Sequence, residues 1–334
     1  MVRIQPVFAS PTVSVALCTH NGGAYVEEQL LSILNQSRLP IEVIVSDDAS
    51  TDDTIAIVRK VFAGQASVVP KLRILTNSVA LGVSKNFEQA VGACAGEIIA
   101  LSDQDDVWVS DRVELMSAEF ATRPELGLLF TDARLVDADG QPLAVSLFQA
   151  LEISESELDL VTRGFSFDTL LRRNLATGAT IMFRRLLLQQ ALPFPSVWVH
   201  DEWLALIASV VSTVGCLRAR LVDYRQHGAN QIGVAVPTLG YKMRRVLQPR
   251  GERPAWLVER ASELLTTVIG LSADESMVDK VRAKLAHDTF RAGLPVTRIL
   301  RLVPVLGEAR AGRYRLYSSQ GNRDILRDLL QPVR

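Results

Sequence analysis

Apolar residues in the first third of the chain alternate between short continuous runs and stretches with helical spacing. The length and β-branched content of the runs predict buried strands over residues 13–20, 41–48, 71–77 and 97–103. Between the runs, apolar side chains recur every three or four positions, which predicts helices over residues 24–36, 50–62 and 84–94. Strands and helices that alternate with short connections predict an α/β fold, with a mostly parallel central sheet and helices on both faces.

Two of the expected helices begin with residues that favour capping. Ser50 and Asp53 have the spacing of a capping box, in which each side chain bonds the backbone amide of the other residue. Ser110 precedes a helical pattern that includes Val113 and Met116. We therefore expect Ser50 and Ser110 to cap the N-termini of their helices.

The pattern is less regular after residue 126. Residues 127–137 and 216–228 have the composition of strands, and residues 177–185 that of a strand, or of a strand running into a helix. Residues 200–214 are expected to start as a loop and to continue as a helix. Beyond about residue 238, the pattern is helical to the end of the sequence.

Charge divides the chain into two regions. Residues 1–240 hold 18 Lys or Arg against 27 Asp or Glu, a net of −9, whereas residues 241–334 hold 18 against 10, a net of +8. We therefore expect a domain over 1–240 and a basic helical region over 241–334. The basic region fits either a solvated helical subdomain or an amphipathic surface that docks on anionic lipid. The overall charge of −1, without aromatic and basic residues interleaved, argues against a nucleic-acid partner.

The cysteines and the apolar runs bear on the compartment. Cys18, Cys94 and Cys216 are odd in number and widely spaced, which argues against a disulfide scaffold or a zinc site and favours a reducing compartment. The longest mostly apolar run, residues 203–211, is far shorter than the ~20 residues of a membrane-spanning helix. The first fifteen residues lack the apolar core of a signal peptide. We expect a cytoplasmic protein, peripheral to a membrane if its basic region docks on lipid.

Polar clusters follow the expected strands at their carboxyl ends, where open α/β sheets bind ligands. They are "THNGG" after residue 18, "SDDAS" after residue 45 and "LSDQDDVW" from residue 101. The last cluster holds three carboxylates within four positions, and like charges so close repel one another. The carboxylates fit either turn and helix caps or a divalent cation, which would remove the repulsion. The three clusters at one sheet edge favour the cation.

These three segments, in this order and spacing, resemble the nucleotide-sugar-binding half of glycosyltransferase family 2 enzymes of GT-A fold. The form "SDQDDVW" is most similar to bacterial enzymes that build O-antigen or capsule polysaccharide, rhamnosyltransferases included. The resemblance covers roughly residues 13–235 and implies a nucleotide-sugar half over about 13–125 and an acceptor half over about 126–240. It implies inverting transfer from dTDP-rhamnose or a UDP-sugar to a hydroxyl of a glycan or lipid-linked acceptor, at the inner face of a bacterial plasma membrane.

The resemblance also implies roles for individual residues. Thr19 and Asn21 match the loop that lines the nucleotide, and either Asp47 or Asp48 matches the acid that hydrogen-bonds the base. The family's D-x-D motif, which holds Mg²⁺ or Mn²⁺ against the diphosphate and touches the ribose, falls here on two acids separated by one residue. They are Asp103 and Asp105.

Two later segments extend the resemblance. "VWVHDEWLAL" is similar to the catalytic-base segment, in which Asp201 matches the base, although the family more often has an E-D pair where this chain has His200 and Asp201. Without the family, Asp201 would fit a helix N-cap, and Glu202 is its rival as base. "YRQHGANQIG" is similar to the terminal signature of the catalytic domain, whose His227 matches a residue that reaches the metal or diphosphate in some members.

Other interpretations remain open at this point. Trp108 and Trp203 are expected to be packing residues. A metal-dependent nucleotidyltransferase would need a basic phosphate loop after the first strand, and "THNGGAY" has no basic residue there other than His20. A non-catalytic nucleotide- or carbohydrate-binding protein would be expected to lack the D-x-D motif or the base, and both are present.

Overall fold

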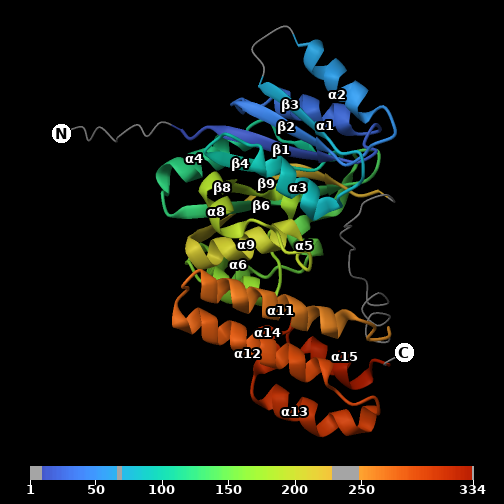
Figure 1. Cartoon of the computed structure of the whole chain (residues 1–334), viewed down its shortest axis with the longest axis vertical. Coiled ribbons are helices and arrows are strands. Elements are labelled where there is room, and N and C mark those ends of the chain that lie inside the picture. The colour runs from blue at the N-terminus through green and yellow to red at the C-terminus, as the bar shows by residue number, and fades with distance from the viewer. Residues whose placement is uncertain (1–9, 66–69, 228–247, 333–334) are drawn as a thin grey trace, which may run out of the picture.

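The computed structural model describes residues 10–65, 70–227 and 248–332. Its N-terminal part is built on one nine-stranded sheet, with strands in the order β3-β2-β1-β4-β8-β6-β9-β5 and with β7 paired to β6 (Figure 1). The strands are β1 (Val13–Thr19), β2 (Glu42–Asp47), β3 (Lys71–Thr76), β4 (Ile98–Ser102), β5 (Val107–Trp108), β6 (Leu126–Val136), β7 (Pro142–Ser146), β8 (Met182–Arg184) and β9 (Thr213–Arg225).

The first four strands form the parallel half of the sheet that the sequence predicts. β1 pairs in parallel with both β2 and β4, and β2 pairs in parallel with β3. The helices between these strands are also confirmed: α1 (Val26–Leu34), α2 (Thr54–Ala63) and α3 (Val83–Gly92). Because the strands run in parallel, the loops after β1, β2 and β4 meet at one edge of the sheet.

The second half of the sheet is mixed. β8 runs antiparallel to β4 and to β6, whereas β6 and β9 run in parallel. The strands expected over residues 127–137 and 216–228 are confirmed as β6 and β9, but the short strands β5 and β7 were not predicted. Residues 177–185 form a strand that runs into helical turns, and the elements there are η1 (Gly178–Thr180), β8, η2 (Arg185–Leu187) and α8 (Leu188–Ala191).

Three expected helix starts are wrong. α2 begins at Thr54 after Asp53, and no side chain caps it, because the Ser50 hydroxyl and amide donate to Asp47 instead. α4 (Arg112–Thr122) follows Asp111 rather than Ser110. α9 (His200–Val211) begins at His200, without the expected loop.

Apolar side chains pack on both faces of the sheet. One cluster includes Phe87, Phe130 and Phe183, and the other, on the opposite face, includes Val15 and Val43. Trp203 and Trp108 are buried in the first and second cluster respectively, which confirms them as packing residues. Three further helices lie between β7 and β8 in the chain: α5 (Leu147–Ala150), α6 (Glu155–Thr162) and α7 (Ser166–Arg172).

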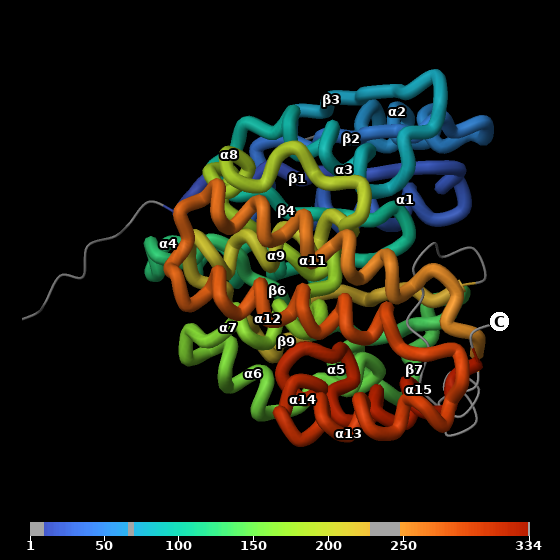
Figure 2. Tube along the Cα trace, turned by 60° about the horizontal axis from the view of Figure 1, so that its bottom comes forward, coloured from blue at the N-terminus to red at the C-terminus, as the bar shows by residue number. Residues whose placement is uncertain are grey.

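The C-terminal region is helical, as predicted. It comprises α11 (Arg253–Gly270), α12 (Glu275–Ala292), η3 (Arg298–Arg301), α13 (Leu302–Arg310), α14 (Arg313–Tyr317) and α15 (Arg323–Leu330). Leu264 of α11 and Val281 of α12 belong to the same buried cluster as Phe87, so these helices extend the core on one side of the sheet (Figures 1 and 2). The expected boundary between residues 240 and 241 lies outside the described residues. Within the described part, every helix is too short or too polar to cross a membrane.

Candidate active site

A cleft of about 660 Å³ opens at the edge of the sheet where the parallel strands end. This volume is within the range of ordinary small-molecule sites. The cleft is lined at the ends of β1, β2 and β4 and, on the opposite side, from α9 and the end of β9. All but one of the site residues expected from the sequence line it: Thr19, Asn21, Asp48, Asp103, Asp105, Asp201 and His227.

The exception, Asp47, is buried beneath the first two loops. Its carboxylate accepts hydrogen bonds from the Thr19 hydroxyl, at 2.7 Å, and from the Ser50 amide, at 3.0 Å. Asp47 therefore joins the loop after β1 to the loop after β2. Asn21, whose φ of +49° is in the left-handed region, strengthens the junction because its side-chain oxygen accepts from the Thr51 amide at 2.9 Å.

Asp48 faces the cleft and at the same time holds a third loop. Its carboxylate accepts from the backbone amides of Leu81, at 2.7 Å, and Gly82, at 2.9 Å, just before α3. Of the two acids that the sequence could not separate, Asp48 is the one that lines the cleft.

The glycine that follows Asn21 lies against the side chain of Gln104. A Cβ on Gly22 would lie 2.1 Å from Oε1 of Gln104, the residue between the two acids of the D-x-D motif. The same Oε1 accepts from the His20 amide at 2.8 Å, and the Gln104 amide nitrogen donates to the His20 carbonyl at 3.1 Å. The absence of a side chain at Gly22 thus lets the loop after β1 lie directly on the loop after β4.

The carboxylates of the D-x-D motif lie close enough for their like charges to repel one another. Burial, followed by the charges of Asp105 and Asp201, raises the pKa of Asp103 to about 7. The Asp105 carboxylate lies 2.8 Å from Nε2 of His227, which stacks on Tyr25 with 4.8 Å between ring centroids. Within the described ranges, no three His, Cys, Asp or Glu side chains form a closed ligand set for one metal ion.

The third acid of the cluster, Asp106, is turned into the protein. It is buried, and its carboxylate accepts from the Arg225 amide at 3.0 Å, which links the end of β4 to the end of β9. Burial and the charges of Asp105 and Asp103 raise its pKa well above the usual range. Asp106 is not among the described residues that line the cleft.

Asp201 lies in the first turn of α9, on the other side of the cleft. One carboxylate oxygen accepts from the Gly178 amide at 2.9 Å, and the other accepts from the Glu202 amide at 2.6 Å. Burial, followed by the charge of Glu202, raises the pKa of Asp201 to about 7. A carboxylate with this pKa is suited to accept a proton near neutral pH.

Glu202 has a different environment. Its carboxylate lies 2.7 Å from a guanidinium nitrogen of Arg260, on α11, and it is absent from the described lining of the cleft. The guanidinium group of Arg260 also lies over the rings of Trp198, at 3.7 Å, and Trp256, at 4.4 Å. Glu202, the other candidate for the catalytic base, therefore forms an ion pair with the C-terminal helix α11.

Sequence reasoning missed His200 as a candidate. Its ring lines the cleft beside Asp201 and stacks on Phe87, with 4.0 Å between centroids. Neither ring nitrogen has a hydrogen-bond partner in the described part of the chain, and burial lowers the pKa of His200 to about 3. The unusual His before Asp201 was visible in the sequence, but its bare nitrogens were not.

Comparison with known proteins agrees with this geometry. The model of "Glycosyl transferase family 2" matches residues 14–159, which contain the ends of β1, β2 and β4 at the cleft. Residues 14–159 are therefore similar to a glycosyltransferase family 2 domain. An uncharacterized protein of Mycobacterium tuberculosis (strain H37Rv) is 27% identical over 219 residues, which cover 64% of this chain and 59% of that protein. The chain thus spans about 59% of the length of this curated relative.

Other relatives match the glycosyltransferase domain or the whole fold. Chondroitin synthase of Pasteurella multocida is 31% identical over 134 residues, which cover 40% of this chain and 13% of that protein. The structure of S. aureus TarS 1–349 with UDP-GlcNAc matches with a TM-score of 0.58 at 17% identity, over 96% of this chain and 90% of that one. The mannosyltransferase of Pyrobaculum calidifontis, solved with GDP-Man and Mn²⁺, matches with a TM-score of 0.53 at 19% identity, over 96% and 86% of the two chains. These structural likenesses establish the GT-A fold.

Proposed function

We propose that this chain is an inverting glycosyltransferase that moves a sugar from a nucleotide-diphosphate donor to an acceptor hydroxyl. The observation that carries the proposal is the arrangement of the cleft. Asp48, Asp103 and Asp105 line its donor side, and Asp201 lines its acceptor side. One cavity therefore holds acids suited to a nucleotide and a cation together with one carboxylate suited to take a proton.

A divalent cation, Mg²⁺ or Mn²⁺, fits the donor side of the cleft. No Lys or Arg is among its described lining residues, so an anionic diphosphate beside Asp103 and Asp105 needs a cation from solution. Carboxylate oxygens are the ligands that such hard cations prefer, and substrate phosphates complete their coordination. Asp103 and Asp105 would hold the ion, with His227 beside Asp105, and the ion would supply charge stabilisation of the departing diphosphate.

The residues of the chain account for the rest of the reaction. Asp48 and Asn21 bind the nucleotide at the sheet edge. Of the two adjacent acids, Asp48 is the one that we propose hydrogen-bonds the nucleobase. Asp201 accepts the proton of the acceptor hydroxyl while the acceptor oxygen bonds to the anomeric carbon. The bond from that carbon to the diphosphate oxygen breaks, and the nucleoside diphosphate leaves with the electron pair. Attack opposite the leaving group inverts the anomeric centre.

Our proposals for the donor, the acceptor and the pathway follow the sequence resemblance. We propose dTDP-rhamnose or a UDP-sugar as donor and a glycan or lipid-linked saccharide as acceptor, in bacterial cell-surface polysaccharide synthesis such as that of O-antigen. TarS, whose structure holds UDP-GlcNAc, supports a donor of this class. A lipid-linked acceptor would place the protein peripherally on the cytoplasmic face of the plasma membrane.

The test is a panel of nucleotide sugars assayed with and without Mn²⁺. The panel contains dTDP-rhamnose, UDP-glucose, UDP-GlcNAc and GDP-mannose, and each is tested for stabilisation of the protein and for slow release of nucleoside diphosphate. A true donor stabilises by mass action, and more strongly with the cation present. Failure of every nucleotide sugar to bind, in a protein that is folded, would contradict the proposed function.

A further inference from the structure

Two C-terminal helices bury acidic side chains, which ordinary surface helices expose. α13 buries Glu308, and α15 buries Asp324 and Asp328. Of the apolar residues of α13, Val305 is buried, whereas Leu302, Val303 and Leu306 are exposed, Val303 by 81%. A helix normally buries its apolar stripe and exposes its polar face, so these helices are organised by a polar interior.

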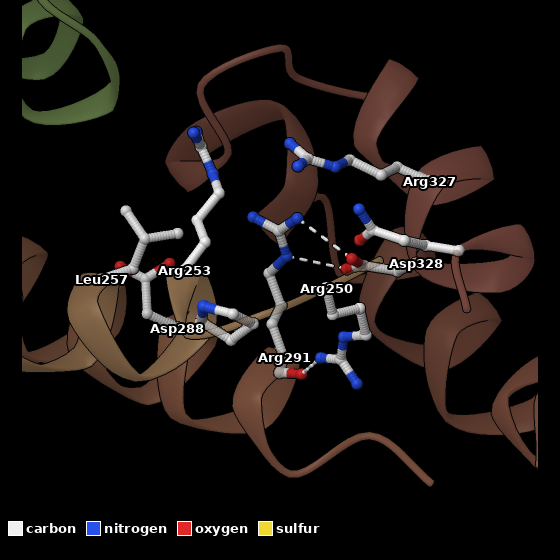
Figure 3. Close-up of a pocket in the computed structure, with 9 residues that line it drawn as sticks. Arg250, Arg253, Leu257, Asp288, Arg291, Arg327 and Asp328 are labelled. Atoms are coloured by element: carbon white, nitrogen blue, oxygen red, sulfur yellow. Dashed lines mark hydrogen bonds and ion pairs between the residues drawn. The ribbon is translucent and has the colours of Figure 1, made fainter. Parts of the chain in front are cut away.

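That interior is a network of buried ion pairs. Arg291 pairs with Asp328 at 2.7 Å, and Arg250 donates to the backbone carbonyl of Arg291 (Figure 3). The Tyr314 hydroxyl donates to Asp328 at 2.8 Å. His287 lies 2.8 Å from Glu308 in the same region. These contacts fix the interior beside a small apolar cluster to which α13 contributes Val305 and Ala309, so its remaining apolar side chains are left outside.

A buried arginine fixes the segment just before α13. Arg301 is fully buried and donates to the carbonyls of Pro295, Val296 and Gln331, at 2.6, 2.9 and 2.7 Å. These bonds hold the backbone of residues 295–301 in place, while the side chains between them face outward. Val296 is 74% exposed and Ile299 is 77% exposed.

The outward side chains form one stripe. Val296, the adjacent Ile299 and Leu300, Val303 and Leu306 recur at three- or four-residue spacing, as on one side of a helix, and all are exposed. We call these five residues the η3–α13 face. A contiguous apolar surface of this kind marks an interaction site rather than ordinary exposure. Figure 1 places α13 at the end of the molecule opposite β2 and β3.

The charged residues near this face indicate that its partner is anionic. Residues 293–323, all of which the structure describes, contain a single acid, Glu308, and it is buried. The same residues contain five exposed arginines, of which Arg313 pairs with Glu308 and Arg323 with Glu152; the others are Arg298, Arg310 and Arg315. An apolar stripe flanked by cations is the composition of a helix that lies in the interface of an anionic bilayer. Two copies of the chain meeting at this face would bring arginines against arginines.

We propose that the η3–α13 face docks on an anionic lipid bilayer, with its apolar side chains in the acyl boundary and its arginines at the headgroups. The inference deepens the proposed function, on which it rests for its purpose, because it names the surface that would hold the enzyme near a lipid-linked acceptor. It predicts binding that needs both apolar insertion and anionic lipid.

The experiment is co-sedimentation of the full chain with vesicles, which requires no activity. Phosphatidylcholine vesicles are compared with vesicles that contain about one quarter phosphatidylglycerol. We expect binding only to the latter, and loss of binding as salt screens the charges. The double variant Ile299→Gln/Val303→Gln should lower the partition coefficient ~10-fold or more. Arg298→Gln/Arg315→Gln should lower it about fivefold for each arginine.

The matched control is Leu186→Gln, which removes a 65% exposed leucine from η2, in the catalytic part. It should bind vesicles as the wild type does, and all variants should keep the wild-type melting temperature. Equal binding by the wild type and the Ile299→Gln/Val303→Gln variant would overturn the proposal. So would a wild-type dimer in solution that this variant converts to monomer. Nucleotide-sugar binding without vesicles stays the separate test of the proposed function.

Discussion

Arg260 of α11 pairs with Glu202 of α9, with 2.7 Å between their charged atoms, and so joins the C-terminal helices to the residue beside Asp201. The pair is mostly buried, and the guanidinium group is enclosed by Trp198 and Trp256. Because the charge of Glu202 contributes to the raised pKa of Asp201, Arg260 is placed to modulate the proposed base through its neighbour.

Arg260→Gln should therefore change the pH dependence of transfer as well as stability. With the cation gone, the uncompensated charge of Glu202 raises the pKa of Asp201 further, and the acidic limb of the rate profile moves to higher pH. Breaking a buried pair costs about 3–5 kcal/mol of stability, so Arg260→Lys is tested beside it as the milder change. Arg282→Gln, which removes an exposed ion pair on α12, is the control. An unmoved pH profile in folded Arg260 variants would refute the modulation.

The parallel half of the fold was predictable from sequence because its apolar runs and helical repeats are regular. The positions of the strand ends, and with them the position of the cleft, were predictable for the same reason. Helix starts were less predictable, since Ser50 donates to Asp47, three residues before it, rather than to the helix, and Asp47 is itself held by Thr19 from a distant loop. β5 is only two residues long and exists through its pairing with β9, so no local pattern announces it.

The site shows the same division. The resemblance to the family implied site roles for Asp103, Asp105 and Asp201, and all three line one cleft in the structure. The sequence could not decide whether Asp47 or Asp48, or whether Asp201 or Glu202, faces the cleft, because it does not show in which direction each of two adjacent side chains points. Direction depends on tertiary partners, such as Thr19 for Asp47 and Arg260 for Glu202.

Asp105→Asn tests the cation. The variant keeps the size of the side chain but removes the charge that would hold a divalent ion beside the diphosphate. We expect the Mn²⁺-dependent part of nucleotide binding to be lost, and turnover to fall at least ~10²-fold. Calorimetric titration of nucleoside diphosphate with and without Mn²⁺ measures the first effect. Asp139→Asn, an exposed acid between β6 and β7, is the control, and Mn²⁺-dependent binding retained by Asp105→Asn would remove Asp105 from the metal site.

Asp201→Asn tests the base against its rival. Asn can still bond the Gly178 amide, so the fold and donor binding should persist, whereas turnover should fall by about 10²–10⁴-fold. Glu202→Gln, measured in parallel, should have a smaller effect because Glu202 points to Arg260. Donor titration and turnover on both variants give the answer. Normal turnover in Asp201→Asn with a collapse in Glu202→Gln would move the base by one residue.

The raised pKa of Asp201 has two consequences with opposite signs. Turnover needs the charged carboxylate, so it should rise with pH and level off above about 7. Stability should fall over the same window, because the native state holds this proton more tightly than the unfolded chain, in which the pKa is near 4. Each unit of difference corresponds to about 1.4 kcal/mol. In Asp201→Asn the fall in stability between about pH 4 and 7 should be shallower, and unfolding in urea across that range measures it. A slope identical to that of the wild type would contradict the assignment.

His200 should bind substrate through its bare ring nitrogens. With its pKa lowered to about 3, the ring is neutral throughout the working range and offers one donor and one acceptor beside Asp201. His200→Phe keeps the stack on Phe87 and the apolar volume but removes both nitrogens. We expect the KM for donor or acceptor to rise about tenfold or more, as when a hydrogen bond of 1.5 kcal/mol is lost, while the pH profile set by Asp201 keeps its shape. The melting temperature should hold or rise, since no buried nitrogen is left without a partner. A KM unchanged for both substrates would mean that the His200 ring only packs against Phe87.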